Sequence, residues 1–356
     1  MVRRPVPAAA PTWDELVVML TERGIEHVGV APASVLERAR TALHSRKAAG
    51  LSADMGFTYR NPDRSTDPQH AVQGARSIIV AARPYRLSDE PAKPPPEDGP
   101  FASVGRYAWV DHYAPLREAL RDVARYIRRS GERAVAFADD NSLVDREVAY
   151  LGGLGWFGKN ANILIPGAGS FFVLGSIVTT LELPVGTPVA DGCAGCRRCL
   201  DGCPTGAIVA PGVVDGNKCL AWLAQKPGTF PVEFRSALGD RLYGCDDCQT
   251  VCPPSVRLGS KHLVDNTGDE PVQAWVDVCE LLESTDEELV AAYGRWYLAE
   301  RDPTWWRRNA LIVLGNTGDA TDRRVAGLIH SYRQHPHEIL REHAEWAAQQ
   351  LGLATV

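Results

Sequence analysis

Over the first 140 residues, the hydrophobic positions alternate between the spacing typical of amphipathic helices and the short apolar runs typical of strands. A capping box at residues 12–15 opens an amphipathic pattern that stops at Gly24, which predicts a helix. Helical spacing of the apolar residues predicts two more helices, at 35–49 and 114–130. Short apolar runs predict strands at 25–30, 77–82 and 134–138. Strands that alternate with helices predict an α/β domain.

The rest of the chain is less regular. A proline-rich run at 91–100 predicts a surface loop. The acidic run at 280–288 is typical of a solvated helix face and linker, and about 60 residues at the C-terminus show helical periodicity. A chain of 356 residues has room for two or three such units.

Composition narrows the class of protein. Apolar residues make up 45% and charged residues 23%, which excludes disorder, collagen-like fibres and coiled coil. The net charge of −6 leaves no global basic surface, so a nucleic acid would have to be bound by a local patch.

Targeting signals are weak in this sequence. No apolar run approaches the roughly 18 residues that span a bilayer. The pair Arg3-Arg4 is similar to a twin-arginine signal, but prolines and polar residues follow in place of an apolar segment. We therefore expect a cytoplasmic protein that does not enter a membrane.

Eight of the nine cysteines fall between residues 193 and 252. The first four follow the bacterial ferredoxin spacing C-x2-C-x2-C-x3-C-P, and a second Cys-Pro follows at 252–253. The exchange of the fourth ligand in ferredoxins predicts one [4Fe–4S] cluster on Cys193, Cys196, Cys199 and Cys252, and another on Cys203, Cys219, Cys245 and Cys248. Structural zinc is the alternative, although the three-cysteine run is poor zinc spacing. Cys279, in a helical pattern, is expected to be a buried core thiol.

The segment 139–160 is rich in acids and glycines. A Walker phosphate loop would need a hydroxyl where Asn160 stands, and the G-x-G-x-x-G match at 153–158 follows a helical pattern and not a strand. Asp139 ends a predicted strand, a common place for a catalytic carboxylate. It could equally cap, as could Asp140, a helix that begins near Leu143.

Several motifs together resemble the epoxyqueuosine reductase family. They are Asp139 with Asp145-Arg146, the run Gly153-Leu154-Gly155-Trp156-Phe157-Gly158-Lys159-Asn160, the cysteine motif at 193–207, and Tyr243-Gly244-Cys245-Asp246-Asp247-Cys248-Gln249. The resemblance extends from about Met55 to the C-terminal helices.

This resemblance implies a multidomain fold of the α+β or α/β class. Residues 1–182 are expected to form a cobalamin-binding α/β domain, and residues 183–262 a ferredoxin-like domain with two [4Fe–4S] clusters. Residues 263–356 are expected to form HEAT-like helical repeats that bind a tRNA anticodon stem-loop. The implied reaction reduces the epoxide of epoxyqueuosine at the tRNA wobble position to queuosine. The clusters pass electrons to cobalamin from an unidentified low-potential donor, and nothing demands more than a monomer.

The resemblance also implies site residues. Asp139 aligns with the proton donor of the family. The expected corrin contacts are Arg64, Gly105, Asp139, Ile163, Leu174, Ala221 and Asp246. Plain core packing is the alternative for Ile163 and Leu174. The negative charge of Asp246 calls for a compensating group, such as a cofactor amide. Phosphate contacts are considered for Arg307, Arg308, Arg323, Arg324 and Arg341.

Departures from the family pattern leave the substrate open, notably at Asn141-Ser142, Asp145 and Pro254. One alternative is a cobalamin and iron–sulfur enzyme that acts on a small molecule, such as a reductive dehalogenase. The lack of an export segment and the helical tail count against it. Another is a ferredoxin-like electron carrier, which leaves residues 139–160 without a purpose.

Overall fold

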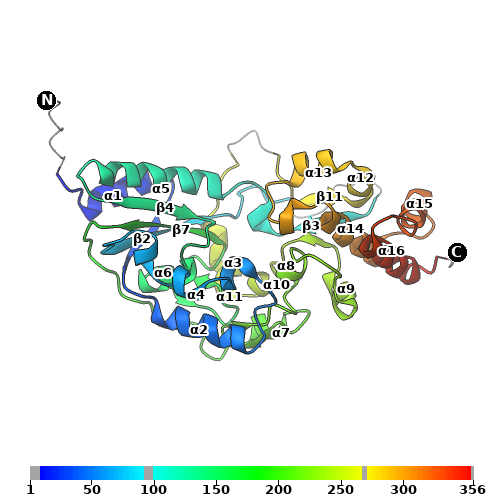
Figure 1. Ribbon diagram of the computed structural model, residues 1–356, viewed down its shortest axis with the longest axis horizontal. Helices are drawn as coiled ribbons and strands as arrows, with labels where there is room; N and C mark the ends of the chain where they lie inside the picture. Colours follow the sequence, from blue (N-terminus) through cyan, green and yellow to red (C-terminus); the bar gives the residue numbers. More distant parts are fainter. Residues whose placement is uncertain (1–8, 92–98, 267–270, 354–356) are drawn as a thin grey trace.

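The computed structural model describes residues 9–91, 99–266 and 271–353 (Figure 1). The arginine pair at 3–4 and the prolines at 94–96 lie outside this range. The predicted elements of the first half are all present, as α1 (Trp13–Thr21), β1 (His27–Pro32), α2 (Glu37–Ala48), β2 (Ser77–Pro84), α5 (Tyr113–Arg128) and β4 (Ala134–Ala138). The capping box of Thr12 and Glu15 forms as predicted.

The main sheet has the order β1-β2-β7-β4, where β7 is Phe172–Thr179. All three pairs of neighbouring strands are antiparallel. The prediction of an α/β domain is therefore wrong for this sheet, which is of the α+β kind. Alternation along the chain does not fix strand direction, because the connection from β1 to β2 through α2, α3 (Gly56–Tyr59) and α4 (Pro62–Ser65) is long enough to return the chain in either direction.

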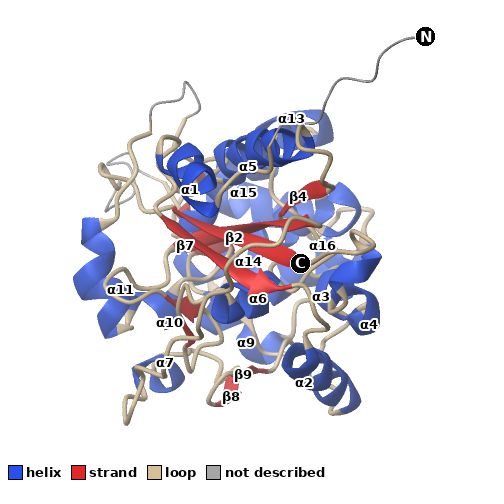
Figure 2. Ribbon diagram, turned by 90° about the vertical axis from the view of Figure 1, so that its left-hand side faces the viewer, coloured by secondary structure: helices blue, strands red, loops and turns tan. Residues whose placement is uncertain are grey.

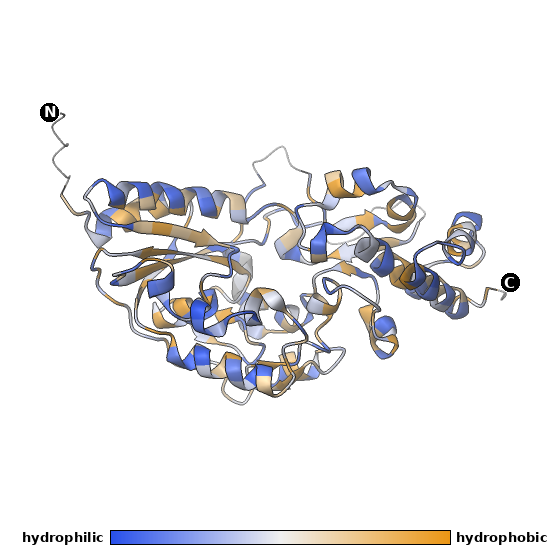
Figure 3. Ribbon diagram, in the orientation of Figure 1, coloured by the Kyte–Doolittle hydropathy of each residue, from blue (hydrophilic) through white to orange (hydrophobic). Residues whose placement is uncertain are grey.

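Helices cover both faces of this sheet (Figures 1 and 2). Ile79 and Ala81 of β2 pack with α1 and α5, whereas Ile78 and Val80 pack on the other face with α2 and α6 (Asp145–Leu151). This alternation follows from the two-residue period of a strand. The strands are accordingly mostly hydrophobic in Figure 3. β4 is an edge strand of this sheet, and Asp139 follows directly after it.

A second core surrounds a three-stranded sheet. Its strand β3 (Phe101–Val104) pairs in parallel with β10 (Arg241–Tyr243) and antiparallel with β11 (Trp275–Asp277). The core contains residues from 87 to 348, and so draws on all three of the segments predicted as domains. The boundaries near 182 and 262 stay predictions. Cys279 is 1% exposed in this core, which confirms a buried thiol.

The C-terminal helices complete this core. They are α12 (Val278–Glu283), α13 (Asp286–Tyr293), α14 (Thr304–Thr317), α15 (Arg323–Tyr332) and α16 (Glu338–Gln350). The helical periodicity is therefore confirmed, and a HEAT-like repeat stays a prediction. Among the described residues, no helix has both the length and the apolar character to cross a membrane.

Short elements hold the cysteine-rich segment. The helices are α7 (Arg198–Asp201), α8 (Leu220–Leu223), α9 (Val232–Leu238), α10 (Asp247–Thr250) and α11 (Pro253–Leu258). Two small hairpins flank them, β5 (Trp156–Phe157) with β6 (Ile163–Leu164) and β8 (Ile208–Ala210) with β9 (Val213–Val214). Loops therefore carry most of the cysteines, and packing against both cores positions those loops.

Candidate active site with two thiol groups

The eight clustered thiols fall into two groups of four. The members of the outer group interact electrostatically and are Cys193, Cys196, Cys199 and Cys252. Those of the inner group likewise interact with one another and are Cys203, Cys219, Cys245 and Cys248. This is the division that the ferredoxin spacing predicts. Cys196 of the outer group is exposed, whereas all four inner thiols are half-buried, and none is in a disulfide.

Hydrogen-bond donors point at the sulfur atoms. The backbone N–H of Ala207 donates to Cys203 Sγ at 3.3 Å, and the indole N–H of Trp156 donates to Cys193 Sγ at 3.5 Å. Backbone groups of α8, including that of Ala221, donate to Cys219. Donors of this kind stabilise sulfur that carries negative charge, as it does when bound to iron.

Burial makes the free thiolates unfavourable. It raises the pKa of Cys245 to about 12, and burial beside other thiols raises the pKa of Cys248 well above its usual value. A cationic centre removes this penalty by ligating the thiolates. In the described part of the chain, no three His, Cys, Asp or Glu side chains surround a point for a single metal ion. A [4Fe–4S] cluster instead joins four thiolates through four irons, and two groups of four suit it.

Asp139 lies directly after β4 in a strained conformation, with φ at +53°. A positive φ is uncommon outside glycine and is often retained at functional sites. Helix α6 begins at Asp145 after Val144 and has no side-chain cap, so neither Asp139 nor Asp140 caps it. Asp140 instead accepts a hydrogen bond from Ser142 N at 2.7 Å.

The side chain of Asp139 is accessible to solvent, yet desolvation raises its pKa. Nearby protein atoms therefore displace part of the water around a carboxyl that stays accessible to solvent. The positive charge of Arg117 opposes the rise, and the negative charges of Asp111 and Asp140 add to it. Asp139 is thus disposed to hold a proton at a higher pH than an ordinary aspartate.

Sequence reasoning did not identify the polar side chains that extend from Asp139 toward the inner group. Tyr113 interacts electrostatically with Asp139 and Asp145, and Tyr243 interacts with Asp139 and Tyr113. Tyr243 also shares a hydrogen bond with Tyr107. Burial raises the pKa of Tyr243 to about 12, so its phenol keeps its proton. The one available signal was the position of Tyr243 two residues before Cys245.

Asp145 is a second carboxyl group beside Asp139. Burial raises the pKa of Asp145 to about 8, and the negative charges of Asp139 and Asp140 contribute to the rise. Ser176 Oγ on β7 donates to it at 3.4 Å. The sequence showed only that an aspartate stands where the family usually has glutamate.

Three of the expected corrin contacts lie around the inner group. A Cβ added to Gly105 would lie 3.2 Å from the Cα of Gly244, so the two backbones are in close contact. Ala221 follows Cys219 in α8. Asp246 accepts hydrogen bonds from the backbone N and the guanidinium of Arg106, at 2.8 and 3.4 Å. Arg106 therefore compensates its charge, and a cofactor amide is not needed for this.

The other three expected contacts differ in their surroundings. Ile163 on β6 is 5% exposed and packs in the core with α6. Leu174 on β7 is half-buried and precedes Gly175, which pairs with Ala138 beside Asp139. Arg64 is exposed in α4, and its side chain has no hydrogen bond or ion pair to any described residue. The structure thus brings Leu174 toward Asp139 and leaves Arg64 at the surface.

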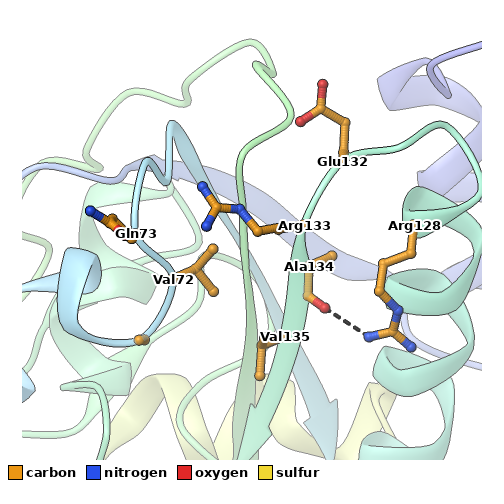
Figure 4. Close-up of a pocket in the computed structure, with 8 residues that line it drawn as sticks. Val72, Gln73, Arg128, Glu132, Arg133, Ala134 and Val135 are labelled. Atoms are coloured by element: carbon orange, nitrogen blue, oxygen red, sulfur yellow. Dashed lines mark hydrogen bonds between the residues drawn. The ribbon is translucent and has the colours of Figure 1, made fainter.

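Two measurable hollows lie elsewhere. One hollow of about 470 Å³ lies at the start of β4, at the other end of the strand from Asp139, and is lined by Arg128 and Arg133 among others (Figure 4). Arg128 donates a hydrogen bond to the carbonyl of Ala134 at 2.8 Å. The other, of about 210 Å³, borders Arg308. Neither hollow is lined by a cysteine or by Asp139.

Known families match two stretches of the chain. Residues 192–255 match a family described as a 4Fe-4S double cluster binding domain, and residues 65–140 match one described as Epoxyqueuosine reductase QueG, DUF1730. The epoxyqueuosine reductase of Bacillus cereus is 32% identical over 92% of this chain and 86% of its own. That of Xanthomonas campestris is 32% identical over 99% of both chains. The chain belongs to the epoxyqueuosine reductase family.

Solved structures of the family agree with the fold. Epoxyqueuosine reductase from Streptococcus thermophilus has a TM-score of 0.85 and 26% identity, with 96% of this chain and 90% of that chain covered. A second family structure, solved with an epoxyqueuosine-modified tRNA-Tyr stem loop, has a TM-score of 0.85 and 28% identity over 95% and 90%. The mixed α+β architecture with a double-cluster domain is therefore that of the family.

Proposed function

We propose that this chain reduces the epoxide of epoxyqueuosine at the wobble position of tRNA to queuosine. The observation that carries the proposal is the kinship of nearly the whole chain to epoxyqueuosine reductases, one of which was solved with the modified stem loop. Two groups of four thiols beside a strained aspartate supply the parts that a reduction needs.

In this proposal each thiol group ligates one [4Fe–4S] cluster. The outer group holds the first cluster, and the inner group holds the second, next to Gly105 and Asp246. Two observations support ligation by all eight cysteines. Hydrogen bonds are donated to sulfur atoms, and binding to iron would remove the desolvation penalty that the buried thiolates otherwise carry.

Cobalamin is the proposed cofactor between the inner group and Asp139. When bound, it supplies low-potential electrons to the substrate. Gly105 has no side chain at its contact with Gly244, and Asp139 is accessible to solvent although desolvation by nearby protein atoms raises its pKa; both are compatible with a group bound between them. We keep Arg64, Ile163, Leu174, Ala221 and Asp246 as proposed contacts, with the best structural support for Leu174 and for those near the inner group.

Asp139 is the proposed proton donor. Removing the epoxide oxygen breaks two C–O bonds and forms a C=C bond, and it consumes two electrons and two protons to release water. The departing oxygen needs an acid close to it. Desolvation of Asp139 raises its pKa, which keeps a larger fraction of the carboxyl protonated.

The C-terminal helices are the proposed HEAT-like site for the anticodon stem-loop. Arg308 is 1% exposed and donates to the carbonyls of Leu223 and Lys226, so it has a structural role and does not contact phosphate. Arg324 pairs with Glu283, whereas Arg323 is exposed without an ion pair to the described residues. Arg323 is therefore the favoured phosphate contact of the five. The remaining two, Arg307 and Arg341, hydrogen-bond to backbone carbonyls. A cytoplasmic monomer stays the prediction.

The test is anaerobic reconstitution with iron, sulfide and vitamin B12, followed by reaction with an anticodon stem-loop that contains epoxyqueuosine. Mass spectrometry of the nucleosides should show queuosine with the wild type and very little with Asp139→Asn. A wild type that binds the vitamin and leaves the RNA unchanged would refute the substrate. An Asp139→Asn variant of full activity would remove Asp139 from its role.

A further inference from the structure

The two thiol groups differ in their access to solvent. In the outer group the loop 194–198 is exposed along its whole length, and it includes Cys196. All four thiols of the inner group are half-buried, and in the outer group Cys199 and Cys252 are buried. Cys196 is the one exposed thiol among the eight. Electron transfer requires close approach of donor and acceptor, so an electron donor that stays outside the protein comes closest to the outer group at Cys196.

Basic side chains border the exposed outer loop. Lys159 Nζ donates to the carbonyls of Ala194 and Cys196 at 2.6 and 2.9 Å, which places its charge against the loop. Arg197 and Arg198 are both exposed and directly follow Cys196. Arg257, on α11 five residues beyond Cys252, is exposed as well. Helix α10 contacts both α7, which begins at Arg198, and α11, which includes Arg257, and the three helices lie toward the same side in Figure 2.

Two carboxylates, those of Asp191 and Asp201, stand against these four positive charges, so the side chains around the loop keep a net charge of +2. The carboxylate of Asp191 accepts a hydrogen bond from Cys193 N at 2.9 Å. Asp201 lies 3.5 Å from Arg197 in an exposed ion pair, which is weak. Arg198 and Arg257 have no ion pair within the part of the chain that the structure describes. A locally basic surface therefore lies on a chain whose net charge is −6.

We propose that the loop 194–198, with Lys159, Arg197, Arg198 and Arg257, is the docking surface for a small acidic electron-carrier protein. The inference rests on the proposed function, since it requires a cluster on the outer thiols. The carrier gives up one electron in each encounter, the outer cluster gains it, and two encounters supply the two electrons for one epoxide. An acidic carrier is repelled by most of this chain and attracted to this surface, which steers it to the outer cluster.

The test uses protein loaded with clusters, without cobalamin or RNA, so that it does not depend on turnover. Reduced acidic [2Fe–2S] ferredoxin is the probe, and the bleaching of cluster absorbance is followed by stopped flow. The double variant Arg197→Glu/Arg198→Glu should be reduced at least tenfold more slowly than wild type at low salt, and the difference should vanish at about 0.5 M salt. Arg121→Glu, an exposed change on α5, is the matched control and should behave as wild type.

Dithionite separates docking from damage to the cluster. It should reduce the double variant and wild type at equal rates. If it does not, the neutral variant Arg197→Gln/Arg198→Gln is used, and a smaller salt dependence of its reduction by ferredoxin supports docking. Equal ferredoxin rates at low salt for wild type and variant would overturn the proposal. In that case, weaker binding of the stem-loop by the same variant, measured separately, would assign the surface to RNA.

Discussion

The most informative single change is Asp145→Asn. Asp145 opens α6, is half-buried beside Asp139 and Asp140, and has one hydrogen bond, from Ser176. Burial raises the pKa of its carboxyl from 3.8 to about 8. The native state therefore keeps a proton on Asp145 at neutral pH that the unfolded chain has released. Asparagine has nearly the same shape and cannot titrate.

The magnitude follows from linkage between proton binding and folding. Where the native state binds one proton more than the unfolded state, the free energy of unfolding falls by about 1.4 kcal/mol for each pH unit. The window runs from the unfolded pKa near 4 to the native pKa near 8. Between pH 5 and pH 8 the wild type should thus lose up to about 4 kcal/mol of stability relative to Asp145→Asn.

Urea unfolding of cluster-loaded protein at several pH values between 5 and 9 measures this difference. Asp122→Asn on α5 is the control, since hydrogen bonding to Arg125 lowers the pKa of Asp122 and its effect should not change between pH 5 and pH 8. If the difference between wild type and Asp145→Asn stayed constant across the range, the carboxyl of Asp145 would be ionised in the native state and the reasoning would fail.

Four other changes test separate parts of the structure. Asp139→Asn should lower the rate of epoxide reduction by about 10² to 10⁴, and wild-type activity should fall as pH rises through the raised pKa of Asp139, as a pH–rate profile would show. Cys199→Ser should lower iron from about eight to about four atoms per chain by colorimetric assay, because only the outer cluster is lost. Gly29→Ala should destabilise by about 3 kcal/mol in urea, since its Cβ would lie 2.2 Å from the carbonyl oxygen of Gly152. Arg308→Met should cost about 3 kcal/mol in the same assay, because it leaves buried carbonyls without donors, and its iron content should not change.

Features set by short stretches of sequence could be predicted. The capping box of Thr12 and Glu15, the apolar run of β2 and the spacing of the cysteines each depend on a few neighbouring residues. The grouping of the eight thiols follows a known spacing in which Cys203 and Cys252 exchange groups, and their ligation of two clusters stays a prediction.

Features set by contacts distant in sequence could not be predicted. Strand direction in the main sheet depends on how the connection from β1 to β2 folds back, which no local pattern reveals. Arg308 reads as a surface cation in the sequence, and only the carbonyls of a segment more than 80 residues away show it to be buried. Tyr113 and Asp145 likewise become neighbours of Asp139 only after the sheet has formed.

The three-stranded sheet has a consequence for the order of biosynthesis. A ribosome makes β3 before any cysteine, and it makes β11 and the helices that close the same core after Cys252, the last of the eight clustered cysteines. The core beside the inner thiols therefore cannot close until the C-terminal helices have been made. A chain that stops before Trp275 would have the eight clustered cysteines but would lack β11 and the C-terminal helices that complete this core.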